Sequence, residues 1–285
     1  MKTRTVRLLV SCPDKKGIVA AVSSFLFDNG ANIIESDQYA TSRSSGVFFI
    51  RIEFEAGKEL ADADNFKRKF GPLAEKFDFN WTVSFAEPRK KMVIFGSLEE
   101  HCVLELLWRW KNGELPVDIP YIISNHEVLK SVADQFGVDF KFFKVDRENR
   151  EKAEQAARAL IRGKVDFIVL ARYMQILTGG FVDEYRNRII NIHHSFLPAF
   201  AGAKPYEQAY QRGVKIIGAT SHYVTEELDR GPIIEQDVER VTHKDNVEEL
   251  KRKGKDIERT VLFRAVKWHA EDRIIVYNNR TIVFA

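Results

Sequence analysis

Apolar residues in the first part of the chain follow two periods, which predict two kinds of element. Residues 4–10 alternate polar and apolar side chains, the period of a half-buried strand. Residues 18–29 instead repeat apolar side chains at helical spacing, beginning with Ile18 and Val22. Three further strands and one helix complete the predicted set: residues 31–38, 46–55, 62–76 (the helix) and 78–85. Their order is β-α-β-β-α-β, the ferredoxin-like plan.

The pattern changes beyond residue 86. Pro88 and a basic run break the periodicity, which predicts a linker over residues 87–91. After it, short apolar strands alternate with helices of roughly 10–15 residues, as in a parallel sheet with helices on both faces. The predicted fold class is therefore α/β, with a ferredoxin-like domain over residues 1–86 and a doubly wound, mostly parallel-sheet domain over residues 92–285. In a doubly wound sheet the site lies beyond the carboxyl ends of the strands.

Two segments near the C-terminus have patterns of their own. Residues 273–285 carry two apolar runs around Asn278 and Asn279, which accept left-handed turn conformations, so we expect a hairpin with a structural role. The charged stretch from Glu248 to Arg259 predicts a solvated loop or helix face.

Composition narrows the class of protein. The chain has 285 residues, with 44 Lys and Arg against 41 Asp and Glu, a net charge of +3. A nucleic-acid binder carries a basic patch, which this balance does not indicate. No segment approaches the roughly 18 apolar residues of a membrane span, and the N-terminus lacks the apolar core of a secretory signal. With Cys12 and Cys102 interpreted as reduced thiols, the sequence predicts a cytoplasmic enzyme without nucleic-acid or membrane partners.

Candidate chemistry concentrates in one segment late in the chain. Asn191 and His193 follow a buried apolar run, and on an extended chain they face one side, whereas His194 faces the other. A carboxamide donor beside an imidazole suits stabilisation of an oxyanion and transfer of protons. A second apolar strand leads to His222, and the loop that follows places Asp229 before a turn.

Two other chemistries are open to the histidines but are not favoured. Since His193 and His194 point to opposite faces of an extended chain, they do not readily share an ion, and we expect no metal site. His101 and Cys102 could be a base and a thiol nucleophile, but adjacent residues at a helix start diverge, so we expect Cys102 to pack in the core. His222 has two interpretations, orienting the downstream carboxylate or hydrogen-bonding within the sheet.

The sequence CPDKKGIVAAVSSFLFDNGANI resembles the start of an ACT domain, a small module that commonly binds amino acids and regulates metabolic enzymes. The resemblance implies a regulatory amino-acid ligand at Asp14, Gly17 and Asn32. Backbone N–H groups at a helix N-terminus attract a carboxylate, which agrees with this interpretation. A plain strand-to-helix turn would contain the same residues, so both interpretations stay open. ACT-like modules often pair, and we expect a homo-oligomer.

Three blocks further along resemble the folate-dependent formyltransferase family. The family pattern N-I-H-x-S-x-L-P, then H-x-V, then D-x-G-P-I-I is met in order at Asn191, His222 and Asp229. The resemblance implies that Asn191, His193 and Asp229 are catalytic. In this family the loop corresponding to ARYMQIL contacts the folate pterin through its backbone, and the loop after His222 forms the opposite wall. The implied substrate-binding residues are Gln175, Ile176, Leu177, His222, Val224, Thr225 and Glu226.

The loop after the first strand of the second domain bears on the formyl acceptor. Family members that formylate glycinamide ribonucleotide carry a Gly- and Asn-rich phosphate loop there, whereas this chain has Glu99 and Glu100, which would repel a phosphate. A tRNA acceptor is disfavoured by the net charge of +3 and by the lack of a tRNA-binding C-terminal domain. Water remains as the acceptor. His101 is then expected to be a substrate-binding residue, lining the pocket where an acceptor phosphate would otherwise lie.

The ACT-like segment and these blocks together resemble the formyltetrahydrofolate deformylase family over essentially the whole chain. The resemblance implies hydrolysis of 10-formyltetrahydrofolate to tetrahydrofolate and formate, which supplies formate for purine synthesis and balances the one-carbon folate pool. The folate is then a substrate, and no cofactor is expected. The alternatives are transfer of the formyl group to an amine, or a folate- or amino-acid-sensing protein without turnover.

Overall fold

The chain forms two compact units, and the computed structural model describes residues 4–42, 46–146, 148–199 and 205–285. The first unit comprises Met1–Arg89 together with two C-terminal segments, Glu271–Tyr277 and Ile282–Ala285. The second comprises Lys90–Ala270 and Asn278–Thr281. The C-terminal segments of the first unit are not expected from the sequence, because a local pattern carries no sign of so distant a partner along the chain.

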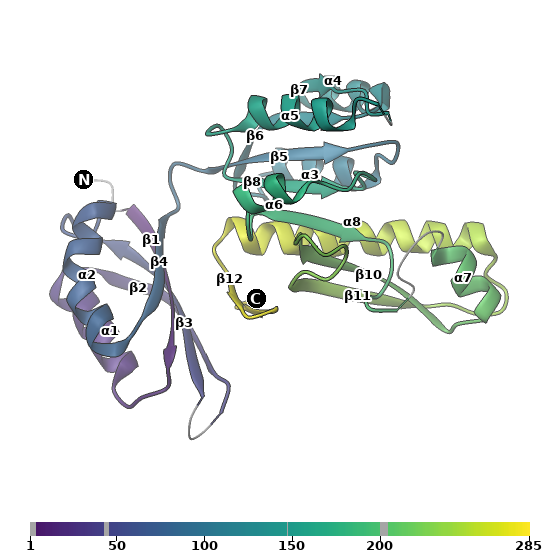
Figure 1. Ribbon diagram of the computed structural model, residues 1–285. Coiled ribbons are helices and arrows are strands. Elements are labelled where there is room, and N and C mark those ends of the chain that lie inside the picture. Colours follow the sequence, from purple (N-terminus) through teal and green to yellow (C-terminus); the bar gives the residue numbers. More distant parts are fainter. Residues whose placement is uncertain (1–3, 43–45, 147, 200–204) are drawn as a thin grey trace. The chain divides into compact units, whose positions relative to one another are not determined.

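The first unit has the predicted β-α-β-β-α-β order. Its elements are β1 (Arg4–Pro13), α1 (Ile18–Asp28), β2 (Asn32–Ala40), β3 (Val47–Ala56), α2 (Ala63–Phe77) and β4 (Asn80–Phe85). The strands form one antiparallel sheet in the order β2-β3-β1-β4. Both helices lie on one face of this sheet (Figure 1). The ferredoxin-like prediction is therefore confirmed.

The face under the helices holds the core of the first unit. Val6, Leu8 and Val10 alternate along β1 and are fully buried, as the two-residue period predicts. Val22 of α1 and Phe66 of α2 pack in the same cluster. The intervening residues of β1 therefore project from the opposite face of the sheet.

That opposite face carries a row of polar side chains. Four of them pair across the four strands at one level: Glu35, Glu53, Arg7 and Ser84. Arg51, two residues before Glu53 on β3, is fully buried. Its guanidinium lies 2.6 Å from Glu35 Oε2 and 2.5 Å from Glu53 Oε2. A buried charge is tolerated when it is paired in this way.

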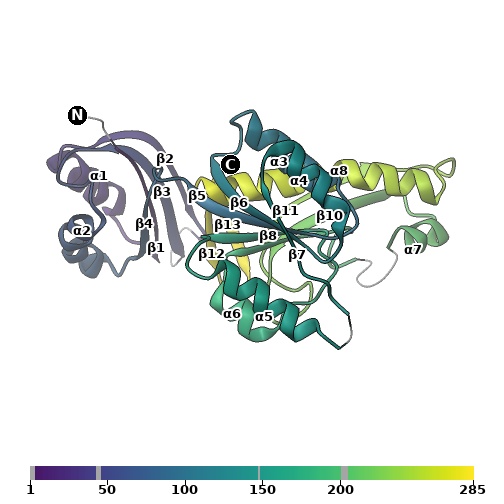
Figure 2. The ribbon, with the colours of Figure 1, turned by 90° about the horizontal axis from the view of Figure 1, so that it is seen from above.

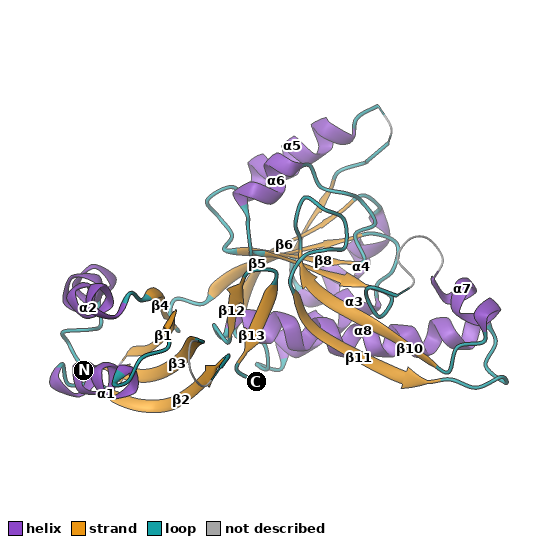
Figure 3. Cartoon of the chain, turned by 60° about the horizontal axis from the view of Figure 1, so that its bottom comes forward, coloured by secondary structure: helices purple, strands orange, loops and turns teal. Residues whose placement is uncertain are grey.

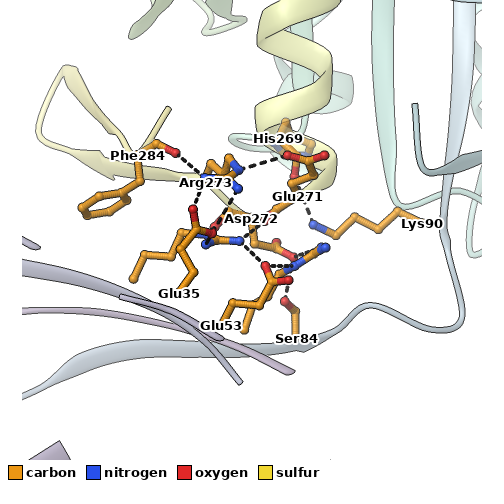
Figure 4. A network of polar contacts seen from close by, with 11 residues as sticks. Glu35, Glu53, Ser84, Lys90, His269, Glu271, Asp272, Arg273 and Phe284 are labelled. Atoms are coloured by element: carbon orange, nitrogen blue, oxygen red, sulfur yellow. Dashed lines mark hydrogen bonds and ion pairs between the residues drawn. The ribbon is translucent and has the colours of Figure 1, made fainter. Parts of the chain in front are cut away.

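A C-terminal segment of the first unit docks on this polar row (Figure 4). Arg51 donates from Nε to the carbonyl oxygen of Asp272 (3.0 Å) and from Nη2 to that of Glu271 (3.1 Å). Ser84 donates its hydroxyl to Asp272 Oδ2 at 2.6 Å. Arg273 forms an ion pair with Glu35, the residue of the row that lies on β2. The N-terminal sheet is thus completed by residues from the far end of the sequence.

The second unit alternates strands and helices. Its elements are β5 (Lys90–Gly96), α3 (His101–Lys111), β6 (Val117–Ser124), α4 (Lys130–Phe136), β7 (Asp139–Phe142), α5 (Arg150–Ile161), β8 (Phe167–Ala171), α6 (Gly179–Glu184), β9 (Ile189–His193), α7 (Pro205–Arg212), β10 (Ile216–Tyr223), β11 (Ile233–Arg240) and α8 (Val247–Ala270), with a 3-10 turn at Glu127–Leu129. The chain ends in the predicted hairpin, β12 (Ile274–Tyr277) and β13 (Arg280–Val283), in which Asn278 has a φ of +55°.

The strands of the second unit form a seven-stranded sheet in the order β11-β10-β9-β8-β5-β6-β7. Strands β5 to β9 run parallel to one another, and β10 pairs antiparallel with both β9 and β11. Helices α3, α4 and α8 lie on one face and α5 and α6 on the other (Figure 2), which confirms a doubly wound, mostly parallel sheet. Within the described part of the chain, no helix is both long and apolar enough to cross a membrane.

The strand order reverses beside β5. The chain runs outward from β5 to β6 and β7, then returns to β8 and β9 on the other side. At such a reversal the loops beyond the carboxyl ends part in opposite directions and leave a crevice. The loop that follows β8, drawn in teal in Figure 3, carries Gln175–Leu177, and Asn191 and His193 lie at the end of the neighbouring strand β9.

Helix α8 replaces the solvated stretch expected over residues 248–259. The helical interpretation is correct, but Leu250, Gly254, Ile257 and Glu258 are buried. The prediction is wrong most clearly at Glu258, which is 1% exposed. A count of charges does not register that one carboxylate lies on the apolar stripe of the helix.

Candidate active site

Two paired strands bring the first candidate residues together. Asn191 of β9 lies opposite His222 of β10, and its Nδ2 is 3.2 Å from His222 Nε2. Side chains of such a pair project from the same face. His222 Nδ1 is 2.9 Å from the carbonyl oxygen of Tyr223. Because a carbonyl oxygen only accepts, Nδ1 donates to it, and Nε2 then accepts from Asn191 Nδ2.

A tight loop after β10 returns Asp229 to these residues. Asp229 has a φ of +56°, a left-handed conformation that Asp tolerates better than most residues. Gly231 passes so close to the strand that a Cβ there would lie 1.7 Å from the carbonyl oxygen of Tyr223. Asp229 Oδ2 is 3.3 Å from His193 Nδ1, and its Oδ1 is 3.7 Å from His222 Nε2. The side chains of His193 and Asp229, which are 36 residues apart in sequence, are thus neighbours.

The contact with His193 sets the charge of Asp229. The hydrogen bond from His193 holds the pKa of the Asp229 carboxyl well below its usual range, although burial opposes this. The carboxylate is therefore ionised at neutral pH and fixes His193 Nδ1 as a donor. His193 Nε2 is buried and has no hydrogen-bond partner among the described residues. A substrate oxygen is the kind of partner that this atom suits.

Asn191, His193 and Asp229 line a cavity of about 430 Å³. The residues implied to contact a folate line the same cavity: Gln175, Ile176, Leu177, His222, Val224, Thr225 and Glu226. Arg150 donates to the carbonyl oxygen of Ile176 and so holds the loop after β8 in place. Apolar side chains with a few converging polar groups are typical of a site for a flat organic molecule.

His194 does not lie where the extended-chain argument places it. Strand β9 ends at His193, and the rings of His193 and His194 are 5.3 Å apart between centroids. Both residues line the same cavity, so the prediction that they face opposite sides is wrong. The two-residue period holds only inside a strand. Burial and then the charge of Arg172 lower the pKa of His194 to about 4, so this ring is neutral at neutral pH.

A second cavity of about 620 Å³ adjoins the first, and Arg172 and His194 line both. His101 lines this second cavity and is not among the residues that line the first. Glu258 lies at its base, where Oε1 accepts from the Tyr206 hydroxyl at 2.7 Å and Oε2 is 2.8 Å from His101 Nε2. Arg172 Nε is 3.6 Å from the same Oε2. His101 is therefore separated from the residues implied to hold the pterin.

Sequence reasoning misses Arg172 and Glu258. Glu258 falls four residues after Gly254 and three before Val261, both buried, and this helical spacing was a readable signal. Burial works to raise the pKa of Glu258, but the hydrogen bond from His101 and the charge of Arg172 lower it on balance. No comparable signal marks Arg172, because a charged residue just beyond a strand is common in exposed loops.

His101, Cys102 and Glu258 place their possible ligand atoms within 4.8 Å of one another. Both oxygens of Glu258 already have hydrogen-bond partners. Burial raises the pKa of Cys102 well above its usual value, which opposes the thiolate that a metal ion requires. These residues therefore fit a packed polar cluster better than a metal site. Cys102 is fully buried, as predicted.

The residues implied to bind a regulatory ligand lie in the first unit. Gly17 is the N-cap of α1, with a φ of +91°. Asp14 lies in the preceding loop, and its N–H donates to the carbonyl oxygen of Gly46 (2.9 Å). Asn32 is the exposed first residue of β2. Among the described residues, no side chain caps α1, so its first N–H groups are left for another partner.

Comparison with known proteins connects both units to one family. The formyl transferase family model matches residues 90–266, and the ACT domain model matches residues 6–65. Formyltetrahydrofolate deformylase from Bacillus subtilis (strain 168) is 55% identical over 279 residues, 98% of this chain and 93% of that protein. Its counterpart from Synechocystis sp. (strain ATCC 27184 / PCC 6803 / Kazusa) is 51% identical over 286 residues, 100% of each chain.

A solved structure agrees over the same length. The crystal structure of a formyltetrahydrofolate deformylase from Pseudomonas syringae pv. tomato str. DC3000 has a TM-score of 0.94 and 46% sequence identity. The match covers 100% of this chain and 96% of that chain. Both resemblances seen in the sequence, to an ACT domain and to a folate-dependent formyltransferase, are confirmed.

Proposed function

Because the chain belongs to the formyltetrahydrofolate deformylase family, we propose that it hydrolyses 10-formyltetrahydrofolate to tetrahydrofolate and formate. The observation that carries the proposal is the meeting of Asn191, His193 and Asp229 in the cavity beside the predicted folate loops. The reaction uses the folate as substrate and requires no cofactor. In the cytoplasm it supplies formate for purine synthesis and balances the one-carbon folate pool.

The loops on either side of the cavity hold the pterin. Gln175–Leu177 forms one wall and Val224–Glu226 the other. Peptide groups suit a pterin because the edge of its ring alternates donors and acceptors, which a backbone edge mirrors. The formyl group then points toward Asn191 and His193.

Attack begins with a water molecule held by Asp229. The ionised carboxylate accepts a hydrogen bond from the water, whose oxygen adds to the formyl carbon while its proton passes to Asp229. Asn191 Nδ2 and protonated His193 Nε2 donate to the oxyanion that forms. Asp229 Oδ2 lies 3.3 Å from the other ring nitrogen, Nδ1, and so orients the ring with Nε2 toward the oxyanion.

Collapse of the tetrahedral intermediate breaks the bond between the carbonyl carbon and N10. The proton taken from water passes to N10 as the amine leaves. Formic acid remains and loses its proton to solvent, so the products are tetrahydrofolate, formate and H⁺. Each atom of the water is thereby accounted for.

Replacing Asn191 or Asp229 tests the assignment of the catalytic trio, Asn191, His193 and Asp229. Asn191→Ala should fold normally and release formate from 10-formyltetrahydrofolate about 10²–10³-fold more slowly, the usual effect of losing an oxyanion donor. Asp229→Asn removes the group that accepts the proton of water and should also fold normally and lose most turnover, by about 10²–10⁴-fold. The assay contains no amine acceptor, and formate is measured directly. Matched controls are Asn112→Ala and Asp118→Asn, exposed positions outside the cavity, which should keep full rates. Near-normal turnover by either trio variant would refute its catalytic role.

Transfer to an amine is the competing activity. The second cavity, where an acceptor could enter, is lined by four cations, Arg172, Lys251, Arg252 and Lys255, and by as many carboxylates: Glu99, Glu207, Glu248 and Glu258. Such a balanced wall gives a phosphorylated amine little electrostatic attraction, which supports water as the acceptor. Formate release that requires an added amine would favour the transferase.

The first unit is proposed to bind a regulatory amino acid at Asp14, Gly17 and Asn32. The uncapped start of α1 supports this, since its N–H groups suit a carboxylate. A thermal shift screen of the natural amino acids, repeated on Asp14→Ala, checks it.

We also propose a homo-oligomer, supported by the exposed apolar residues Phe27 and Ile34 of this unit. Light scattering that gives the monomer mass at micromolar concentration would contradict that proposal.

A further inference from the structure

Arg172 stands at the junction of the two cavities. It is the first residue after β8, and with His194 it lines both spaces. Its φ of +62° is left-handed, a conformation that Arg rarely adopts. Strained backbone of this kind persists where the surroundings hold a side chain in a required place.

The Arg172 guanidinium is buried but incompletely paired. Its side chain is 13% exposed, and Nε and Nη1 have no hydrogen-bond partner within the described structure. Glu258 is its nearest carboxylate, but the 3.6 Å separation from Nε is too long for a hydrogen bond. A buried cation with unused N–H groups is costly unless a ligand completes it.

The other cations of the second cavity are already paired. Lys255 lies 2.7 Å from Glu99, Arg252 2.8 Å from Glu249, and Lys251 3.2 Å from Glu248. His194 is neutral at neutral pH and adds no charge. Among these cations, the unused N–H donors are therefore those of Arg172. A single guanidinium suits one small anion better than a phosphate chain.

We propose that Arg172 binds the carboxylate of formate as it leaves the catalytic cavity. This rests on the proposed hydrolysis, because formate is the anion which that reaction releases beside Arg172. A guanidinium recognises a planar carboxylate by charge-assisted hydrogen bonds. Glu258 repels the same anion, so binding is weak enough for release through the second cavity.

Binding of ¹³C-formate tests the site without requiring turnover. The linewidth of the formate carbon is followed during titration of the full chain, with sodium chloride keeping the ionic strength constant. Arg172→Gly removes the guanidinium and places at φ +62° the residue that best tolerates it. Its affinity for formate should fall about 10–100-fold, the usual effect of losing a charge-assisted hydrogen bond.

Arg252→Ala is the matched control. Arg252 lines the same cavity, but its side chain is 66% exposed and already bonded to Glu249. Its formate affinity should stay within about twofold of the unmodified protein, since a solvated, paired cation contributes little. Arg172→Asn, which also tolerates a left-handed backbone, replaces the glycine variant if that one unfolds.

The outcomes separate the two proposals. Saturable formate binding that is lost in the Arg172 variants supports the site, whether or not the protein deformylates its folate. Unchanged binding in those variants, an equal loss in Arg252→Ala, or no saturable binding to the unmodified protein would overturn it. Failure of formate release from 10-formyltetrahydrofolate would instead contradict the proposed function and leave a measured formate site standing.

Discussion

The ring of His222 is held by the backbone carbonyl group of Tyr223 and not by the carboxylate of Asp229. Its Nδ1 proton is used by the carbonyl oxygen of Tyr223, and its Nε2 atom accepts from Asn191. The 3.7 Å separation from Asp229 exceeds a hydrogen bond. Of the two roles considered from the sequence, the geometry favours bonding within the sheet, with Asn191 as the group that His222 orients.

His194 gives the stability of the protein a dependence on pH. The unfolded chain takes up its proton near pH 6.5, whereas the folded protein resists protonation until about pH 4. Stability therefore falls as the pH drops through that window, by up to about 3 kcal/mol. His194→Gln should flatten the decline, as measured by urea unfolding at pH 7.5 and pH 4.5. His243→Gln is an exposed control and should leave the difference unchanged. An equally steep decline in His194→Gln would exclude this source.

At the residue scale, sequence reasoning succeeds where spacing alone carries the information. The three family blocks placed Asn191, His193 and Asp229, and the structure brings these residues together. The helical spacing of Glu258 was readable, but the proximity of Arg172 to Glu258 lay beyond it, because no local pattern marks Arg172 or relates the two residues. Their roles depend on contacts between residues that are 86 positions apart.

At the element scale, α8 both packs in the second unit and contacts residues around the two cavities. Its apolar stripe packs in the second unit, while Glu258 on the same stripe supports Tyr206 of α7 and His101 of α3. Near its C-terminus, His269 Nδ1 lies 2.8 Å from the hydroxyl of Tyr223, the residue that follows His222. One helix therefore braces both cavities.

Gly254 shows how packing reverses a helix propensity. Alanine is normally preferred to glycine inside a helix by about 1 kcal/mol. A Cβ at Gly254, however, would lie 1.9 Å from the Tyr206 hydroxyl. Gly254→Ala should therefore lower the free energy of unfolding by about 1–3 kcal/mol, because Tyr206 must move away from Glu258.

Gly71 of α2 provides the matched control for that substitution. A Cβ there would meet nothing within 4 Å. Gly71→Ala should change the free energy of unfolding by less than about 1 kcal/mol, because the helix propensity of alanine is offset by the restriction that Pro72 places on the preceding residue. Urea unfolding of both variants gives the comparison, and a stabilised Gly254→Ala protein would contradict the packing argument.

Element order was predictable because periodicity is local, and element ends were not. Lys90 and Lys91 were expected in a linker, yet β5 starts at Lys90, where pairing with β6 extends the strand. Likewise, β9 stops at His193. Both boundaries are decided by neighbouring strands, which the pattern of a single segment does not contain.

At the scale of the whole molecule, the first unit depends on Arg51. This side chain joins two carboxylates of the sheet to two carbonyl groups of residues 271–272. Arg51→Met should take one of two cations from each carboxylate, because Arg7 and Arg273 remain, and should leave the two carbonyl groups without their donor. We expect it to destabilise this unit by about 1–3 kcal/mol. Hydrogen exchange of the β3 amides measures the loss locally.

The control is Arg186→Met, which removes a 77% exposed arginine from a surface pair. It should change stability by less than about 1 kcal/mol. Equal protection of the β3 amides in Arg51→Met and Arg186→Met would show that Arg51 does not hold the segment.

The attachment of residues 271–273 also orders events during synthesis. The ribosome releases the N-terminal sheet first, but the carbonyl partners of Arg51 emerge more than two hundred residues later. Until then Arg51 on the nascent sheet lacks two of its hydrogen-bond acceptors. A gene fragment that stops after the linker would therefore encode an unfinished module, so Arg51 and residues 271–272 are constrained to evolve together.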